Sequence, residues 1–400
     1  MASVVGFPRR EVQIVGLISA AHFLSHFYLY SLVPHYQSIA DGLGVGLGTL
    51  SLGITAYVVC TGVLQTPMGY LVDRVGGRKV LVGGLFILAA SIGSISLVTE
   101  TWQFISLMAL AGIGNSVFHP ADYSIISVSI DDGRLGKAFS FHSLGGSSGM
   151  LLGPAIMGFL IFLEIPWRTS IIIAGAIGIA LAMILLIFGG LIGEGGATKE
   201  KAPAPPWRVL LTSRPLLLLL LFYLCSSAAN AGIAHFSVAA LGAMYGIPVV
   251  SAALALTFYL GGSLALTLPG GVLADRTDNH HGIMILCLAV SAAMMALAGL
   301  GWLPFWLVIG LLAISGGMRG LVIAARDVNV RHSAAPHSVG TVFAFVSTGF
   351  LFGGAVTLPF YGWLLDIGRP DLVFWMSGAM TVCSIGAVIL HKRFKSAGQK

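Results

Sequence analysis

The chain has 400 residues, of which 56% are hydrophobic and 9% are charged, with a formal net charge of +6. A soluble domain carries roughly 25% charged residues, so this composition excludes an ordinary soluble protein. Apolar runs of about 20 residues, enough to cross a hydrocarbon core of roughly 30 Å, recur along the whole chain. The composition therefore predicts an all-α integral membrane protein.

About twelve of these apolar runs are expected to form transmembrane helices. They begin near Val12, Thr49, Val80, Trp102, Lys137, Thr169, Pro215, Val249, Gly282, Pro304, Gly340 and Leu372. The first run follows Arg9, Arg10 and Glu11, and no small-x-small cleavage site accompanies it. It is also too long for the apolar region of a signal peptide, so we expect it to remain as the first span.

A polar segment separates the sixth run from the seventh. Its sequence, GEGGATKEKAPAPPWRVLLTSR at 193–214, is rich in glycine, proline and charge. Such a composition is typical of a linker, which we expect to lie on the cytoplasmic side at 194–212. The chain is thus predicted to contain an N-terminal six-helix bundle at 1–193 and a C-terminal six-helix bundle at 213–400.

The two halves share a local repeat. QTPMGYLVDR at 65–74 recurs as TLPGGVLADR at 267–276, and Asp73 and Asp275 are separated by the same 202 positions as the two segments. Two pseudo-symmetric bundles around a central cavity are the architecture of many secondary transporters. We therefore expect about twelve helices arranged in two such bundles.

The distribution of lysine and arginine predicts the orientation in the membrane. If both termini are cytoplasmic, only Arg168 and Arg369 fall in outer loops, and Arg319 falls inside a span. Basic residues concentrate in cytoplasmic loops, so the net charge reflects topology and no nucleic-acid partner is expected. We expect a multi-pass protein of a bacterial-type inner membrane that is surrounded by lipid and functions as a monomer.

The segment GYLVDRVGGRK at 69–79 combines close glycines, an aspartate and a basic cluster. Glycine lets helices approach, an aspartate can face a helix N-terminus, and basic residues hold a loop at the inner surface. The segment resembles the signature loop between helices two and three of the major facilitator superfamily, and the resemblance covers the whole chain. It implies a gating role at the inner surface for Asp73, Arg74, Arg78, Asp275 and Arg276.

The fifth run contains GMLLGPAIMG, with small residues and a proline at Gly149, Gly153, Pro154 and Gly158. These residues predict a kinked helix with one face that packs closely on a neighbour. The pattern is similar to the helix-five motif that the superfamily associates with proton-coupled exporters, and it favours export. Helix packing without any bearing on transport direction is the alternative.

The fourth run departs from the family pattern. Gly112–Gly114 is preceded by Met108, where the family usually has an arginine linked to proton coupling. Coupling would therefore use other groups. GIGNSVFHPADYS at 112–124 and HFLSHFYLYSLVP at 22–34 resemble the fosmidomycin-resistance efflux branch, which implies efflux of a drug or an anion rather than uptake of a sugar.

Ionisable residues inside a span are costly and become candidates for function. His22 and His26 lie one turn apart near the middle of the first run, and with Tyr30 they are candidates for substrate binding. His119, Asp122 and His142 are candidates for proton coupling, because histidine has an unperturbed pKa of about 6.5. A structural hydrogen-bonding role is the alternative for His119, which precedes a helix-bending proline at Pro120.

Partners are also expected for two of the charged residues. Asp122 is expected to pair with Arg134 or Lys137 in a network at the inner surface. Arg319 lies among glycines within the tenth run and needs an anion, which we expect to be the carboxylate or phosphonate of a substrate. The alternatives are pairing with Asp122, with Asp327 or with backbone carbonyls.

Residues near the ends of the runs are given lesser roles. Arg326 and Asp327 end the tenth run and are expected to form a gate salt bridge. Four further histidines near span ends are expected to be solvated, namely His35, His235, His280 and His281.

The leading hypothesis is proton-coupled efflux of a small amphipathic anion or drug by an antiporter with alternating access. Proton-linked uptake of an organic anion is the nearest alternative. Transport of a metal or metal complex draws on the His22 and His26 pair, but no cysteine or carboxylate cluster completes a coordination shell. No resident metal or cofactor is expected, and no arrangement of nucleophile and base predicts an enzyme.

Overall fold

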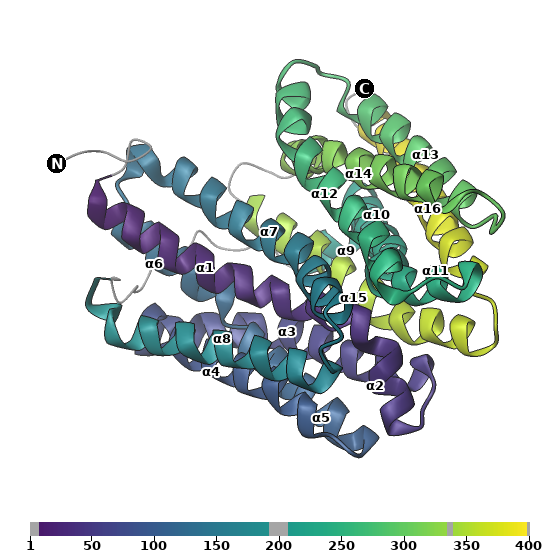
Figure 1. Cartoon of the computed structure of the whole chain (residues 1–400). Helices are drawn as coiled ribbons and strands as arrows, with labels where there is room; N and C mark the ends of the chain where they lie inside the picture. The colour runs from purple at the N-terminus through teal and green to yellow at the C-terminus, as the bar shows by residue number, and fades with distance from the viewer. Residues whose placement is uncertain (1–7, 192–206, 334–338, 398–400) are drawn as a thin grey trace. The chain divides into compact units, whose positions relative to one another are not determined.

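The computed structural model describes residues 8–191, 207–333 and 339–397, which are helical and include no β-strand (Figure 1). The first half contains α1 (Arg9–Ser31), α2 (Tyr36–Leu43), α3 (Leu47–Val75), α4 (Gly77–Ser94), α5 (Thr101–Asn115), α6 (Phe118–Ser129), α7 (Leu135–Phe162) and α8 (Trp167–Ile187). The second half contains α9 (Trp207–Thr212), α10 (Arg214–Ala231), α11 (Ser237–Tyr245), α12 (Val249–Asp275), α13 (His280–Ala298), α14 (Phe305–Ser333), α15 (Val339–Asp366) and α16 (Asp371–Ala397).

Within the described residues, 12 helical stretches are long and apolar enough to cross a membrane. Each predicted span start lies within about three residues of a helix start, which reflects the strength of the apolar pattern. The predicted all-α membrane fold with twelve spans is therefore confirmed.

Three of the spans are interrupted. A 3-10 turn at Val33–His35 separates α1 from α2, and a five-residue π-helix at Gly232–Phe236 separates α10 from α11. In the fourth span α5 ends at Asn115 and α6 begins at Phe118. Pro120 thus lies in the first turn of α6. Residues in the first turn have no hydrogen-bond acceptor within the helix for their N–H, so a proline is tolerated there. The helix is broken before the proline rather than bent at it.

The contacts divide the chain into two compact units. One comprises Met1–Val45 with Leu52–Glu200, and the other comprises Gly46–Ser51 with Lys201–Lys400. Most of the expected linker, at 194–206, lies outside the described residues, and α9 occupies its last six positions.

Glycines of the predicted helix-five motif allow α7 to lie against α1 in the first unit (Figure 1). A Cβ atom on Gly149 would collide with the carbonyl oxygen of Phe23, and one on Gly153 would lie 3.0 Å from the carbonyl oxygen of Phe27. In the second unit α15 packs on α10 in the same way, because a Cβ atom on Gly353 would collide with the carbonyl oxygen of Leu224. Backbones this close require glycine.

The repeat found in the sequence extends to packing. Tyr57 in α3 and Tyr259 in α12 are separated by the same 202 positions as Asp73 and Asp275. A Cβ atom on Gly112 would collide with the carbonyl oxygen of Tyr57, and one on Gly316 would collide with that of Tyr259. Each unit therefore has a glycine crossing at the equivalent tyrosine, although the two glycines are 204 rather than 202 positions apart.

Candidate functional site

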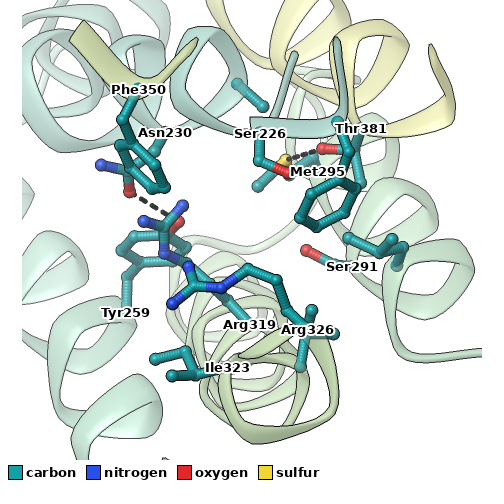
Figure 2. A pocket seen from close by; sticks show the side chains of 14 residues that line it. Ser226, Asn230, Tyr259, Ser291, Met295, Arg319, Ile323, Arg326, Phe350 and Thr381 are labelled. Carbon is teal, nitrogen blue, oxygen red and sulfur yellow. Dashed lines mark hydrogen bonds between the residues drawn. The ribbon is translucent and has the colours of Figure 1, made fainter. Parts of the chain in front are cut away.

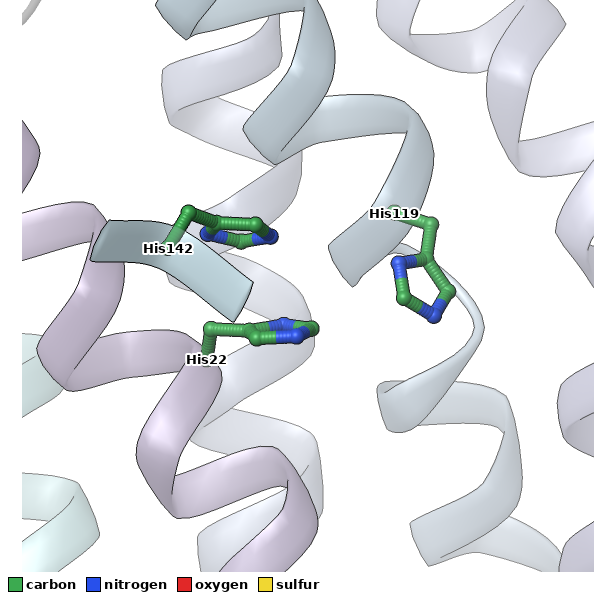
Figure 3. Close-up of side chains that lie close together, drawn as sticks. All are labelled: His22, His119 and His142. Atoms are coloured by element: carbon green, nitrogen blue, oxygen red, sulfur yellow. The ribbon is translucent and has the colours of Figure 1, made fainter. Parts of the chain in front are cut away.

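The first unit contains a cluster of ionisable side chains, here called the histidine–aspartate cluster, in which three members are buried (His22, Asp122 and His142) and two are half-buried (His26 and His119). His22 and His26 come from α1, His119 and Asp122 from α6, and His142 from α7. The rings of His22 and His142 are stacked with centroids 3.9 Å apart, and the His119 ring lies 5.3 Å from that of His22 (Figure 3). The candidates for substrate binding on α1 and the candidates for proton coupling on α6 and α7 thus form one cluster.

Asp122 is the only carboxylate among these five residues and is fully buried. Its Oδ2 atom lies 3.4 Å from Nδ1 of His22 and 3.7 Å from Nε2 of His142. Neither carboxylate oxygen accepts a hydrogen bond of good geometry, and the same holds for Nδ1 of His22 and both ring nitrogens of His142. A buried carboxylate without partners is costly, so this arrangement is suited to gaining a cation next to Asp122.

The expected partner of Asp122 was wrong. Arg134 forms a bidentate ion pair with Glu11, in which both nitrogen–oxygen distances are 2.8 Å. The side chain of Lys137 is exposed. Glu11 lies in the first turn of α1, where an acidic side chain also faces the unpaired N–H groups of the helix. Arg134 therefore ties the start of α7 to the start of α1, and Asp122 is left to the histidines.

Gly146 of α7 is a site residue that the sequence reasoning missed. A Cβ atom there would lie 2.6 Å from the His22 ring and 2.8 Å from the His26 ring. The absence of a side chain at this position makes room for both imidazoles. Its signal was the small-residue run Gly145–Gly149, which continues the helix-five motif by one turn toward the start of α7.

Three of the histidines meet the distance requirement for a metal site. The ligand atoms of His22, His119 and His142 all lie within 4.8 Å of one another. Asp122 lies near two of them, His22 and His142, but it does not belong to the group whose ligand atoms are mutually within this distance.

The second unit contains a cavity with a positively charged wall, here called the arginine cavity (Figure 2). Arg319 and Arg326 of α14 line it together with Asn230 of α10 and Tyr259 of α12. The remaining lining is mostly apolar and includes Phe222, Leu288, Met295, Val322, Ile323 and Phe350. A space with one charged wall and a larger apolar surface is suited to an amphipathic ligand.

Arg319 is held by neutral groups. Its guanidinium group lies beside Tyr259, whose hydroxyl donates to Oδ1 of Asn230 at 3.2 Å (Figure 2). Among the described residues of the second unit, no carboxylate lies within ion-pairing distance of Arg319, and Asp327 is paired with Arg326 instead. The charge of Arg319 is open to an anionic ligand.

Arg326 also lines the cavity, and its charge has a partner. Its Nε atom lies 2.8 Å from Oδ1 of Asp327, and its guanidinium carbon lies 4.9 Å from the centre of the Tyr223 ring. Tyr223 donates its hydroxyl to the same Asp327 oxygen at 3.4 Å. Arg326 therefore lines the cavity while Asp327 supports it from outside the lining, and the gating role of the pair stays a prediction.

Sequence reasoning did not single out Asn230, Tyr259 or Tyr223. Tyr259 had a signal, because it repeats Tyr57 after 202 residues. Asn230 had a weaker one, as an amide within an apolar run. Nothing in the sequence linked Tyr223 to Asp327, since 104 residues separate them.

The other predicted site residues lie elsewhere. Tyr30 is buried two turns beyond His22 on α1, and Gly158 and Pro154 are buried in α7. Asp73, Arg74, Asp275 and Arg276 are exposed, and Arg78 lies against Gly189. No ion pair joins Asp73 or Asp275 to another described residue, so the gate assigned to them stays a prediction.

The histidines near span ends are not solvated as expected. His35, His235 and His280 are buried, with exposed fractions of 1%, 6% and 8%, and His281 is half-buried. His280 bonds the carbonyl of Ala274, and His281 bonds His391 at 3.0 Å. The expectation failed for His35 and His235 because their spans continue past them, to Leu43 and Tyr245.

Comparisons with known proteins agree with the fold. The family described as Major Facilitator Superfamily matches residues 18–251 and 220–400 of the chain. The chain is 23% identical over 380 residues to the fosmidomycin resistance protein of Escherichia coli K12, which covers 92% of this chain and 89% of that protein. It is also 23% identical over 347 residues to the multidrug resistance protein MdtH of Salmonella typhi, covering 81% of each.

A solved structure has the same fold. The bacterial homologue of the human lysosomal transporter Spinster, in an inward-facing and unoccupied conformation, superposes with a TM-score of 0.78. The match covers 96% of this chain and 97% of that one at 15% identity. Twelve apolar spans, a repeated half and a match along nearly the entire sequence lead to one assignment. The chain belongs to the Major Facilitator Superfamily and is a multi-pass membrane transporter rather than an enzyme.

Proposed function

We propose that the protein exports a small amphipathic anion or drug in exchange for protons, by alternating access in an inner membrane with both chain termini in the cytoplasm. The observation that carries the proposal is the arginine cavity. Arg319 faces a largely apolar space and has no carboxylate partner among the described residues of the second unit. An anion with an apolar body would supply both missing contacts.

The histidine–aspartate cluster supports protons as the coupling ion. Asp122 is buried between His22 and His142, and their distances allow a proton to be shared after a small movement of the side chains. Adding a proton removes the uncompensated charge of the carboxylate and thus stabilises one conformation relative to the other. His119 and His26 complete the surroundings of the site.

Two observations support export as the direction of transport. The helix-five glycines pack α7 tightly on α1, as expected for the motif of exporters. Two relatives carry resistance in their names, which is consistent with removal of toxic compounds. Uptake of an organic anion remains the competing direction, since Arg319 would serve it equally well.

The test uses purified protein in liposomes with an imposed pH gradient. Transport of a labelled amphipathic anion against its own gradient should follow protons moving the opposite way and should stop when the gradient is collapsed. Arg319→Ala should abolish transport, while Arg369→Ala, which removes an exposed loop arginine, should not. Movement of anion and protons in the same direction would replace export by uptake, and equal transport by Arg319→Ala would remove the cavity from the pathway.

A further inference from the structure

We propose that Asp327 sets the charge of the ligand, so that the arginine cavity accepts organic monoanions and discriminates against dianions. This inference rests on the proposed function, because it assumes that an anion binds at Arg319. It adds a specificity-determining residue, since Asp327 is not itself among the residues that line the cavity.

The two arginines of the cavity differ in what surrounds their charges. Arg326 has a carboxylate at 2.8 Å and an aromatic ring under its guanidinium group. Asp327 is in turn fixed by the Tyr223 hydroxyl, so it is held beside Arg326 by two contacts. Arg326 is therefore neutralised by the protein before any ligand arrives.

Arg319 has only dipolar neighbours. Tyr259 and Asn230, which are hydrogen-bonded to each other, lie beside the guanidinium group and leave its net charge unchanged. The Arg319, Arg326 and Asp327 side chains together carry a formal charge of +1, counted as two arginines and one aspartate. One negative charge on the ligand balances this sum.

The match between the charge of the ligand and that of the cavity matters because most of the lining is apolar. An uncompensated charge in a cavity with mostly apolar walls is unfavourable, so a second carboxylate on the ligand would need its own cation. Arg326 could supply it only by leaving Asp327 and the face of Tyr223. The rest of the lining includes Phe222, Leu288 and Val322, which fit an apolar end of the ligand.

The inference is tested by binding of hexanoate and adipate to the purified full-length protein, measured by calorimetry. The two ligands have the same chain length and differ by one carboxylate. We expect wild-type protein to bind hexanoate at least about tenfold more tightly than adipate. Asp327→Asn keeps the shape of the side chain but raises the formal charge of the cavity to +2, so the preference should disappear or reverse.

Three further variants test whether the ligand preference follows the formal charge of the cavity. Arg326→Gln together with Asp327→Asn restores a charge of +1 and should restore the preference for hexanoate. Arg326→Gln alone brings the sum to zero and should weaken binding of both anions. Asp371→Asn removes a carboxylate of an ion pair at the start of α16, and this control should keep the wild-type ratio.

The outcomes separate this inference from the proposed function. Binding that is lost in Arg319→Ala, with a hexanoate preference unchanged in Asp327→Asn, would overturn the role of Asp327 and leave the anion site intact. Equal affinities of wild-type protein for the two ligands would also overturn it. Binding of neither anion by wild-type protein, or full binding by Arg319→Ala, would overturn the proposed anion site itself.

Discussion

Oδ2 of Asp122 lies 3.4 Å from Nδ1 of His22, which connects α6 to α1 at a point closed to solvent. Asp122→Asn keeps the size of this side chain and removes its ability to exchange a proton. We expect anion export driven by a pH gradient to fall at least about tenfold, which corresponds to roughly 1.4 kcal/mol, while exchange of internal for external anion continues. Both rates are measured in liposomes.

The matched control is Asp132→Asn, which removes an exposed carboxylate ten residues further along the chain and should leave both rates unchanged. Gradient-driven export at the wild-type rate in Asp122→Asn would exclude Asp122 as the coupling group. Accumulation of Zn²⁺ by wild-type protein that vanishes in this variant would instead identify the cluster as a path for metal ions.

Gly146→Ala is expected to affect coupling more than stability. The new methyl group would lie 2.6 Å from the His22 ring and 2.8 Å from the His26 ring, and rings can rotate away where a backbone cannot. We expect a loss of folding stability of about 1 kcal/mol or less, with a clear fall in gradient-driven export. Gly136→Ala, at an open position of the same helix, is the control. Wild-type export by Gly146→Ala would show that the ring positions do not matter for coupling.

Gly149→Ala is expected to affect folding stability more than coupling. Its methyl group would meet the carbonyl oxygen of Phe23 and so force α7 away from α1. Overpacking of this kind typically costs about 1–3 kcal/mol, so the melting temperature in detergent should fall by several degrees. Gly16→Ala has open space around it and serves as the control. An unchanged melting temperature would mean that the close helix contact contributes little.

The sequence was sufficient for the fold because apolar runs and short polar breaks are local signals that the membrane makes strong. It was less informative about the cluster, although all five members were recognised as candidates. Helical spacing placed His22 and His26 on one face, but the meeting of His22 with His142 depends on how closely α7 approaches α1. Asp122 was assigned to the wrong partner because its predicted depth near the inner end of the span favoured a basic group there, whereas the folded chain places Arg134 beside Glu11.

Tyr259→Phe tests whether the arginine cavity depends on the orientation of Arg319. The change removes a hydroxyl that donates to Asn230 beside Arg319, and it keeps the aromatic ring. A hydrogen bond between neutral groups contributes about 0.5–1.5 kcal/mol, so anion affinity should fall by up to about tenfold. Tyr57→Phe is the matched control, because Tyr57 occupies the same position of the repeat and its hydroxyl donates to the carbonyl of Ser25 at 3.5 Å. Calorimetry with hexanoate should therefore distinguish the two variants, and an equal loss of affinity in both would mean that the effect arises from helix packing rather than from the orientation of Arg319.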